Sequence, residues 1–210
     1  MRCSRNKMRG FGRDIELARY LCKGSGAEDF IKVFYTLALQ TPNSPFVIIG
    51  FSLGGNLALR AAGILGKEAT KVVKRIIAIA PPCDLFSGVK RVSSPANRFY
   101  HRYFLKHLKA KVREAFYPDF PKVNFPHDMT LLDFDSICTA PEGGYKDALD
   151  YYKQCSAKFF IKYIGVDARI VFAKDDPLIC SEQLDGLNYP KNVKIYKTER
   201  GGHLGHVARK

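Results

Sequence analysis

The sequence lacks any apolar run of the length that a membrane-spanning helix needs. Its basic start, Met1 to Lys7, is not followed by the apolar core of a secretory signal peptide. The six cysteines form no C-x-x-C pair and show no compact spacing, so neither a zinc site nor the disulfide framework of a small secreted domain is indicated. Internal repeats are also absent. We therefore expect a cytoplasmic protein whose thiols are reduced and partly buried.

The chain does contain enough apolar material for one substantial core. It has 210 residues, of which 46% are hydrophobic and 26% charged, as is typical of soluble globular proteins. Helical and strand patterns alternate, which predicts a mostly parallel sheet with helices on both faces in a single domain, 1–210. The expected helices are 27–40, 56–65 and 144–155, and the expected strands are 46–49, 75–80, 168–173 and 193–196. A helical cap is expected at about 86–135.

The formal net charge of +14 is concentrated in part of that cap. No acidic residue occurs between Arg98 and Arg113, and basic residues at 98, 102, 106, 109 and 113 recur at helical spacing. Aromatic residues such as Phe99, Tyr103 and Phe104 alternate with them. Such a helix could contact anionic lipid headgroups or nucleic-acid phosphates, or it could be an ordinary solvated surface helix. No nucleic-acid-binding signature occurs elsewhere, so we expect no nucleic acid as a partner and keep the membrane surface as a hypothesis.

One short segment combines a strand, a sharp turn and a helix start. The apolar run 46–49 is continuous, as expected of a strand buried on both faces, and it leads into Gly50-Phe51-Ser52-Leu53-Gly54. This G-x-S-x-G pattern is that of a nucleophile elbow, in which residues two before and two after the serine must be small so that strand and helix can pass closely. Ser52 is therefore the candidate nucleophile. The amide of Leu53, at the helix start, is the candidate oxyanion donor.

A serine nucleophile needs a base, and the base needs an acid that orients it. Asp175 and Asp176 follow the strand that ends at Ala173, and His203 lies in a glycine-rich loop after the last expected strand. The order serine, aspartate, histidine is that of the α/β hydrolases. We favour Asp176 as the acid with Asp175 as the alternative, and His203 as the base with His206 as its closest competitor.

The other histidines lack the right sequence context. His101 and His107 belong to the basic cap segment, and His127 follows a proline in a loop.

Several further segments carry a resemblance to a known family. They are Gly50–Asn56, Ala80–Leu85, Asn97–Tyr100, Phe134–Asp135 with Thr139–Pro141, Asp147 with Asp150–Tyr152, Asp175–Pro177 and Gly201–Gly205. Together they resemble the YheT-like branch of the α/β hydrolases, over nearly all the chain from about Arg9. The resemblance implies an α/β-hydrolase fold and a serine esterase that cleaves carboxyl esters of acyl lipids or of short to medium acyl chains. By position it assigns the nucleophile to Ser52, the acid to Asp176 and the base to His203.

The same resemblance predicts a fold that is incomplete at both ends. Family members carry extra strands and a histidine-glycine loop ahead of the matching region, and a final helix after the histidine loop. We therefore expect only the Leu53 amide to be assignable in the oxyanion hole. The strand that ends at Ser52 is expected to have an open edge.

The expected chemistry is acyl transfer through an acyl-enzyme, with a small-molecule ester as substrate and with no metal or organic cofactor. Two alternatives remain open: a shortened, catalytically impaired hydrolase, and a basic binding module for anionic surfaces. The oligomeric state is not predicted.

Overall fold

The computed structural model describes residues 3–5, 26–42, 44–114 and 125–206. Cys22, one of the six cysteines, and the first part of the family resemblance lie outside these residues. The helices and strands follow one another as α1 (Ala27–Gln40), β1 (Val47–Phe51), α2 (Leu53–Leu65), β2 (Arg75–Ile79), α3 (Leu85–Val92), α4 (Arg98–Glu114), α5 (Leu131–Phe134), α6 (Ala140–Gly143), α7 (Ala148–Cys155), β3 (Asp167–Ala173) and β4 (Val193–Thr198).

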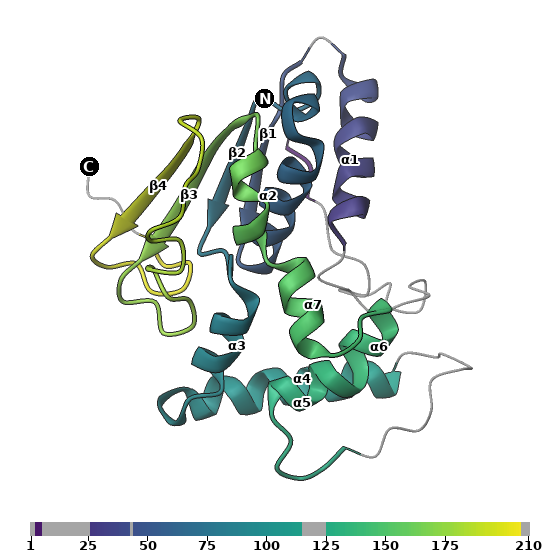
Figure 1. The fold of residues 1–210 in the computed structure, drawn as a ribbon, viewed down its shortest axis with the longest axis vertical. Coiled ribbons are helices and arrows are strands. Elements are labelled where there is room, and N and C mark those ends of the chain that lie inside the picture. The colour runs from purple at the N-terminus through teal and green to yellow at the C-terminus, as the bar shows by residue number, and fades with distance from the viewer. Residues whose placement is uncertain (1–2, 6–25, 43, 115–124, 207–210) are drawn as a thin grey trace.

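The four strands form one parallel sheet in the order β1-β2-β3-β4 (Figure 1). Every strand starts within one residue of its expected position, because a continuous apolar run between turn residues is a strong strand signal. All four carboxyl ends point the same way, toward the lower part of Figure 1. This arrangement confirms the predicted α/β class with a parallel sheet.

The described helices cover one face of this sheet. On that face α2 lies over β1 and β2, and Ile76, Ala78, Ala168 and Ile170 are fully buried. Side chains alternate between faces along a strand, so the neighbouring residues point to the other side. The sequence predicts helices on both faces of the sheet, and within the described residues the structure has them on one face.

Strand β1 is an edge strand of the described sheet, as expected. Its only strand partner there is β2. Val47, Ile49 and Phe51 point to the face that the described helices leave open, and they are 47%, 54% and 54% exposed. Apolar side chains beside an unpaired strand edge form a surface that favours association with other chains.

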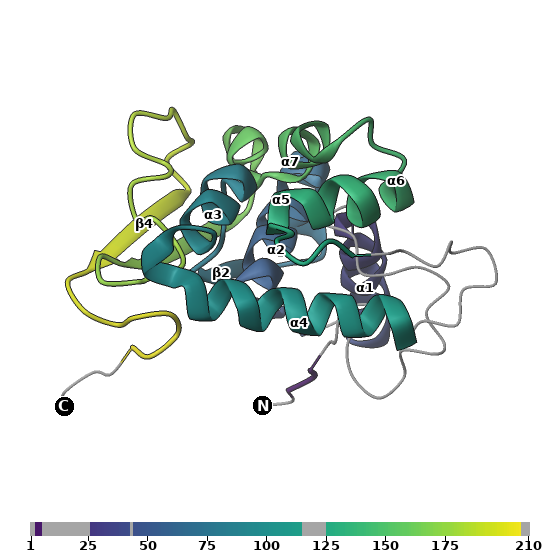
Figure 2. The same cartoon turned by 90° about the horizontal axis from the view of Figure 1, so that it is seen from below.

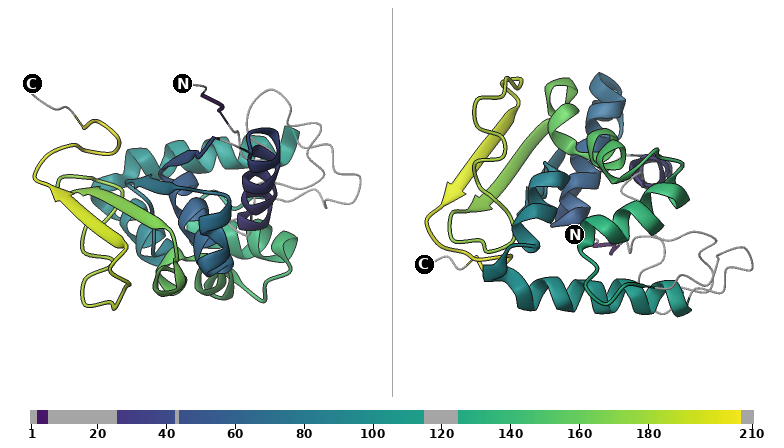
Figure 3. Two further views of the ribbon diagram at one scale, coloured as in Figure 1. Left: turned by 90° about the horizontal axis from the view of Figure 1, so that it is seen from above. Right: turned by 60° about the horizontal axis from the view of Figure 1, so that its bottom comes forward.

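Helices α3 to α6 lie beyond the carboxyl ends of the strands (Figure 1). Local capping explains where α3 and α5 begin: the Asp84 carboxylate accepts a hydrogen bond from the Ser87 amide, and Thr130 and Asp133 form a capping box at α5. Long helix α4 runs across this end of the molecule (Figures 2 and 3), and its Leu105 and Val112 reach the main core. Segment 86–135, whose described helices lie at this end of the sheet, is called the cap below.

The described cysteines are all free thiols, and Cys83, Cys138 and Cys155 are buried. Within the ranges given above, no helix combines the length and the apolar character that crossing a bilayer requires.

A buried amide connects α2 to the end of α7. Asn56 has no exposed surface; its Nδ2 donates to the Cys155 carbonyl at 3.0 Å, and its Oδ1 accepts from the Ala157 amide at 2.9 Å. Both partners are backbone groups that lie away from water. The side chain therefore fixes the helix that follows Ser52 against a segment about a hundred residues later.

We expect Asn56→Ala to destabilise the fold, by about 1–3 kcal/mol for each backbone group left unpaired. Urea unfolding followed by circular dichroism measures the loss. The matched control is Asn188→Ala, which removes an exposed amide and should change stability by less than about 0.5 kcal/mol. Equal midpoints for the two variants would contradict the bridging role.

Candidate active site

Ser52 stands at a sharp turn between β1 and α2. Its backbone has φ 48° and ψ −124°, a conformation that non-glycine residues rarely adopt. The Ser52 amide donates to the Ile79 carbonyl at 2.9 Å, so the turn is held by the neighbouring strand. A strained serine held in this way at the carboxyl end of a strand is the geometry that the G-x-S-x-G pattern predicts.

The close approach of strand and helix depends on Gly50 and Gly55. A Cβ atom on Gly50 would lie 2.6 Å from the Gly54 carbonyl oxygen and 2.7 Å from Gly55 Cα. One on Gly55 would lie 3.0 Å from the Gly50 carbonyl oxygen and 3.1 Å from Pro81 Cβ. A Cβ on Gly54 would meet nothing within 4 Å. The expectation that position 54 must be small for this packing is therefore wrong, because the second close contact is made one residue later.

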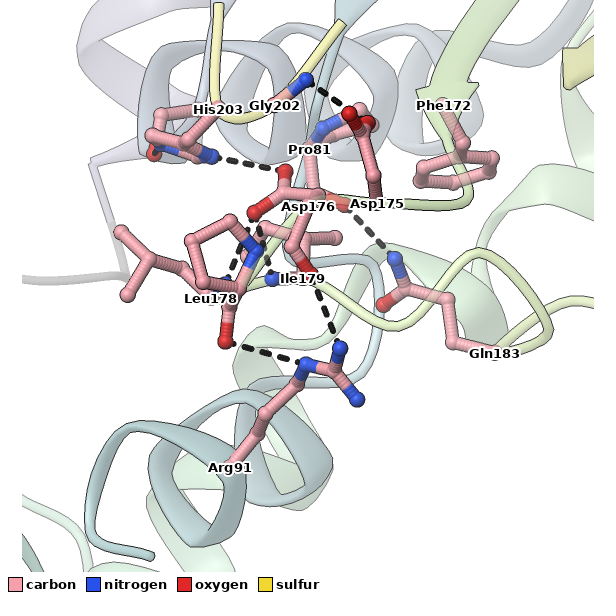
Figure 4. Close-up of polar contacts among 12 residues, drawn as sticks. Pro81, Arg91, Phe172, Asp175, Asp176, Leu178, Ile179, Gln183, Gly202 and His203 are labelled. Atoms are coloured by element: carbon pink, nitrogen blue, oxygen red, sulfur yellow. Dashed lines mark hydrogen bonds and ion pairs between the residues drawn. The ribbon is translucent and has the colours of Figure 1, made fainter. Parts of the chain in front are cut away.

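Three side chains from distant parts of the chain meet at this turn. His203 Nε2 lies 3.1 Å from Ser52 Oγ, and His203 Nδ1 lies 2.9 Å from Asp176 Oδ2. With its proton on Nδ1, the imidazole donates to the carboxylate and accepts from the serine hydroxyl. Figure 4 shows His203 directed toward Asp176 from the loop after β4. His203 is thus within hydrogen-bonding distance of both Ser52 and Asp176.

The carboxylate of Asp176 is almost completely enclosed by protein. The residue is 1% exposed, and its second oxygen, Oδ1, accepts from the amides of Leu178 and Ile179 at 2.8 and 3.0 Å (Figure 4). These donors offset the cost of removing a charged group from water. They also aim the other oxygen at the imidazole.

Asp175, the alternative acid, has a different contact. Its Oδ1 accepts from the backbone amide of Gly202 at 2.8 Å, next to His203 (Figure 4). Asp175 therefore holds the loop that carries the imidazole, whereas Asp176 faces the imidazole itself.

His206, the competing base, lies beside β4, with its Nδ1 3.4 Å from Thr198 Oγ1. Its ring also occupies the space that a Cβ on Gly201 would need, 2.5 Å away. The ring centroid of His107 lies 4.1 Å from that of Tyr103 in α4, and His101 accepts from the Leu131 amide. These contacts place the three imidazoles outside the Ser52 hydrogen-bonding group.

The buried cysteines are poorly suited to act as nucleophiles. Cys83 lies in the loop after β2 without exposed surface, and burial raises the pKa of its thiol far above the ordinary range. Burial also raises the pKa of Cys138, to about 11. Since the thiolate is the reactive form, both groups are protonated and inert at neutral pH.

The first amides of α2 point toward the same turn. Gly55 and Asn56 donate to the Ser52 carbonyl at 2.9 and 3.2 Å. The amide of Leu53 opens the helix, where an α-helix supplies no carbonyl partner from its own preceding turn. Leu53 therefore stays the candidate oxyanion donor.

The sequence did not point to the side chains that surround this group. Gln183 donates to the Pro81 carbonyl and accepts from the Asp84 amide, which fixes the loop after β2. Arg91 of α3 donates to the carbonyls of Asp176 and Pro177. Arg91 is one of several basic residues in the cap, and no sequence pattern distinguishes it from the others.

Comparison with known proteins identifies the family of this chain. A family profile described as "alpha/beta hydrolase fold" matches residues 8–131, more than half of the chain. The chain belongs to the α/β-hydrolase family. Esterase YheT of Escherichia coli (strain K12) is 33% identical over 172 residues, covering 79% of this chain and 50% of that protein, so the YheT-like resemblance is confirmed.

Other relatives extend the comparison. The monoacylglycerol lipase of Saccharomyces cerevisiae is 28% identical over 197 residues, covering 88% of this chain and 43% of the lipase. The chain spans about half the length of these curated relatives. Among solved structures, a puromycin hydrolase variant aligns with a TM-score of 0.51 and 16% identity over 92% of this chain and 24% of the hydrolase, which supports the fold alone.

We expect Gly50→Ala to lower the free energy of unfolding by about 1–3 kcal/mol, because its methyl group would overlap the backbone of Gly54 and Gly55. The control is Gly54→Ala, whose methyl group meets open space and replaces a poor helix former. Its stability should be unchanged or higher by up to about 1 kcal/mol. Chemical denaturation of both variants measures the difference, and equal losses would contradict the assigned contacts.

Proposed function

We propose that this protein is a serine hydrolase that cleaves carboxyl esters through Ser52, His203 and Asp176. The observation that carries the proposal is the pair of contacts at 3.1 and 2.9 Å that link the serine hydroxyl through the imidazole to a buried carboxylate. The names of the relatives, an esterase and a monoacylglycerol lipase, agree with ester hydrolysis.

In the proposed reaction, His203 Nε2 accepts the Ser52 proton while Oγ attacks the ester carbonyl carbon. The carbonyl oxygen gains the negative charge and is stabilised by the Leu53 amide. Asp176 holds the Nδ1 proton and stabilises the imidazolium. When the tetrahedral intermediate collapses, the alcohol leaves with the proton from His203, and the acyl group remains on Ser52. Water, deprotonated by the same imidazole, then releases the acid.

The proposed substrates are esters of acyl lipids or of short to medium acyl chains. Two relatives are named as a monoacylglycerol lipase and a phospholipase, which favours a substrate with an acyl chain. The described part of the cap contributes exposed aromatic side chains, among them Phe86 and Phe104. Apolar groups close to the carboxyl end of the sheet suit an acyl chain.

A fluorophosphonate probe tests the nucleophile directly, because it reacts with an activated serine. We expect labelling of the wild-type protein and its loss in Ser52→Ala, with hydrolysis of p-nitrophenyl butyrate falling by about 10³-fold or more. The control variant is Ser136→Ala, which removes an exposed hydroxyl shortly after α5. Failure of folded wild-type protein to react would favour the alternative of a catalytically impaired hydrolase.

We also propose that the outer face of α4 contacts anionic membrane surfaces. Phe99 and Tyr103 are 70% and 59% exposed on this face. Arg102, Lys106 and Arg113 are exposed along its flank, and the helix carries no acid before position 114. Aromatic side chains beside a row of cations complement the interface of a bilayer that contains acidic lipids.

Sedimentation with vesicles tests this contact. We expect binding to vesicles with phosphatidylserine and not to pure phosphatidylcholine. In the variant Arg102→Gln/Lys106→Gln/Arg113→Gln the affinity for the anionic vesicles should fall about 100-fold, since each charge near the surface contributes about 1 kcal/mol. The charge-matched control is Lys67→Gln/Lys191→Gln/Lys194→Gln, which changes exposed lysines elsewhere.

The aromatic residues separate a bilayer from other polyanions. Phe99→Ala/Tyr103→Ala should weaken vesicle binding but leave retention on heparin unchanged, since only the bilayer offers an apolar interior. Equal vesicle binding by the two triple variants would overturn the assignment to α4.

A further inference from the structure

The loop 174–179 after β3 carries Asp176 and is called the acid loop below. It is held by the cap as well as by the sheet. Arg91 lies in the last turn of α3, and its guanidinium group extends to the loop after β3 (Figure 4). Nη2 donates to the Asp176 carbonyl at 2.8 Å, and Nε donates to the Pro177 carbonyl at 3.1 Å. One planar side chain thus binds two successive carbonyl groups.

A second cap residue binds the same loop. Asn97, in the short 3-10 turn Pro95–Asn97 before α4, is 8% exposed. Its Nδ2 donates to the Pro177 carbonyl at 2.7 Å and to the Arg91 carbonyl at 3.0 Å. The amide therefore links the end of α3 to the loop. It also provides Pro177 with a second donor from the cap.

These contacts complement those of the Asp176 side chain. The carboxylate binds the amides of Leu178 and Ile179, so it fixes the N–H groups that follow it in the loop. Arg91 and Asn97 bind the carbonyl groups of residues 176 and 177. With both sides of the turn bound, rotation of the peptide units would break at least one hydrogen bond. The carboxylate thereby keeps its direction toward His203.

We propose that Arg91 and Asn97 are positioning residues that set the orientation of Asp176 and so couple the cap to the reacting groups. Neither touches Ser52 or His203; both act through the backbone of the acid loop. A guanidinium group suits this role because its N–H donors have a fixed planar arrangement. A lysine ammonium is a compact charge on a flexible chain and lacks that arrangement. The proposal rests on the proposed function, in which Asp176 orients the base.

The test compares Arg91→Met, Arg91→Lys and Asn97→Asp with Lys90→Met, the control that removes the preceding, exposed cation of the same helix. We expect kcat on p-nitrophenyl butyrate to fall about 10- to 100-fold in Arg91→Met and Asn97→Asp, since small displacements of catalytic groups have effects of this size. KM should change by less than about threefold. Arg91→Lys should recover part of kcat, and Lys90→Met should match the wild type.

The rate of fluorophosphonate labelling, divided by the folded fraction from thermal unfolding, separates positioning from stability. A reduced rate in fully folded Arg91→Met and Asn97→Asp is expected. Labelling at the wild-type rate, or a deficit that disappears after the correction, would overturn the role of the two residues. If instead Ser52→Ala labels as the wild type does, the proposed function fails, and that result is independent of the Arg91 variants.

Discussion

A buried carboxylate determines how the segments around the site must meet. Asp176 is 1% exposed, and an isolated charge in that position would cost several kcal/mol of desolvation. Two backbone amides and an imidazole surround its oxygens, and the loop that presents them is fixed in turn by Arg91 and Asn97. The sheet, the cap and the histidine loop therefore each contribute to one charged group. Removing any of them leaves that charge with fewer partners.

The parallel sheet explains why residues 52, 176 and 203 can meet although they are far apart in sequence. In parallel strands the carboxyl ends lie at one edge, so turns that follow β1, β3 and β4 are neighbours in space. The sequence therefore indicates these three residues as candidates, because an elbow pattern, an acid after a strand and a glycine-rich loop with a histidine all occur at strand ends. The element types followed from the same apolar periodicity, and α1 spans its predicted residues.

Other features depend on three-dimensional contacts that no local pattern encodes. Asp175 and Asp176 differ in the direction of two adjacent side chains, one toward the Gly202 amide and one toward the imidazole. The tight glycine contact falls on Gly55 rather than Gly54 because the helix turns that residue toward Pro81. Arg91 was indistinguishable from the other cap cations, since its role follows from a loop 85 residues later.

The cap is attached to the site through backbone carbonyl groups, and this has a consequence for how its outer surface can vary. Arg91, Asn97 and the inward side chains of α4, Leu105 and Val112, make the attachment. The outer side of α4 carries Phe99, Arg102, Tyr103 and Lys106, which are exposed and lie away from these contacts. Changes on that outer side can therefore alter what the cap contacts while the acid loop keeps its geometry. Changes on the inner side affect both the contacts of the cap and the geometry of the acid loop. The reason is that the helices that shelter the carboxyl end of the sheet also hold the carbonyls beside Asp176.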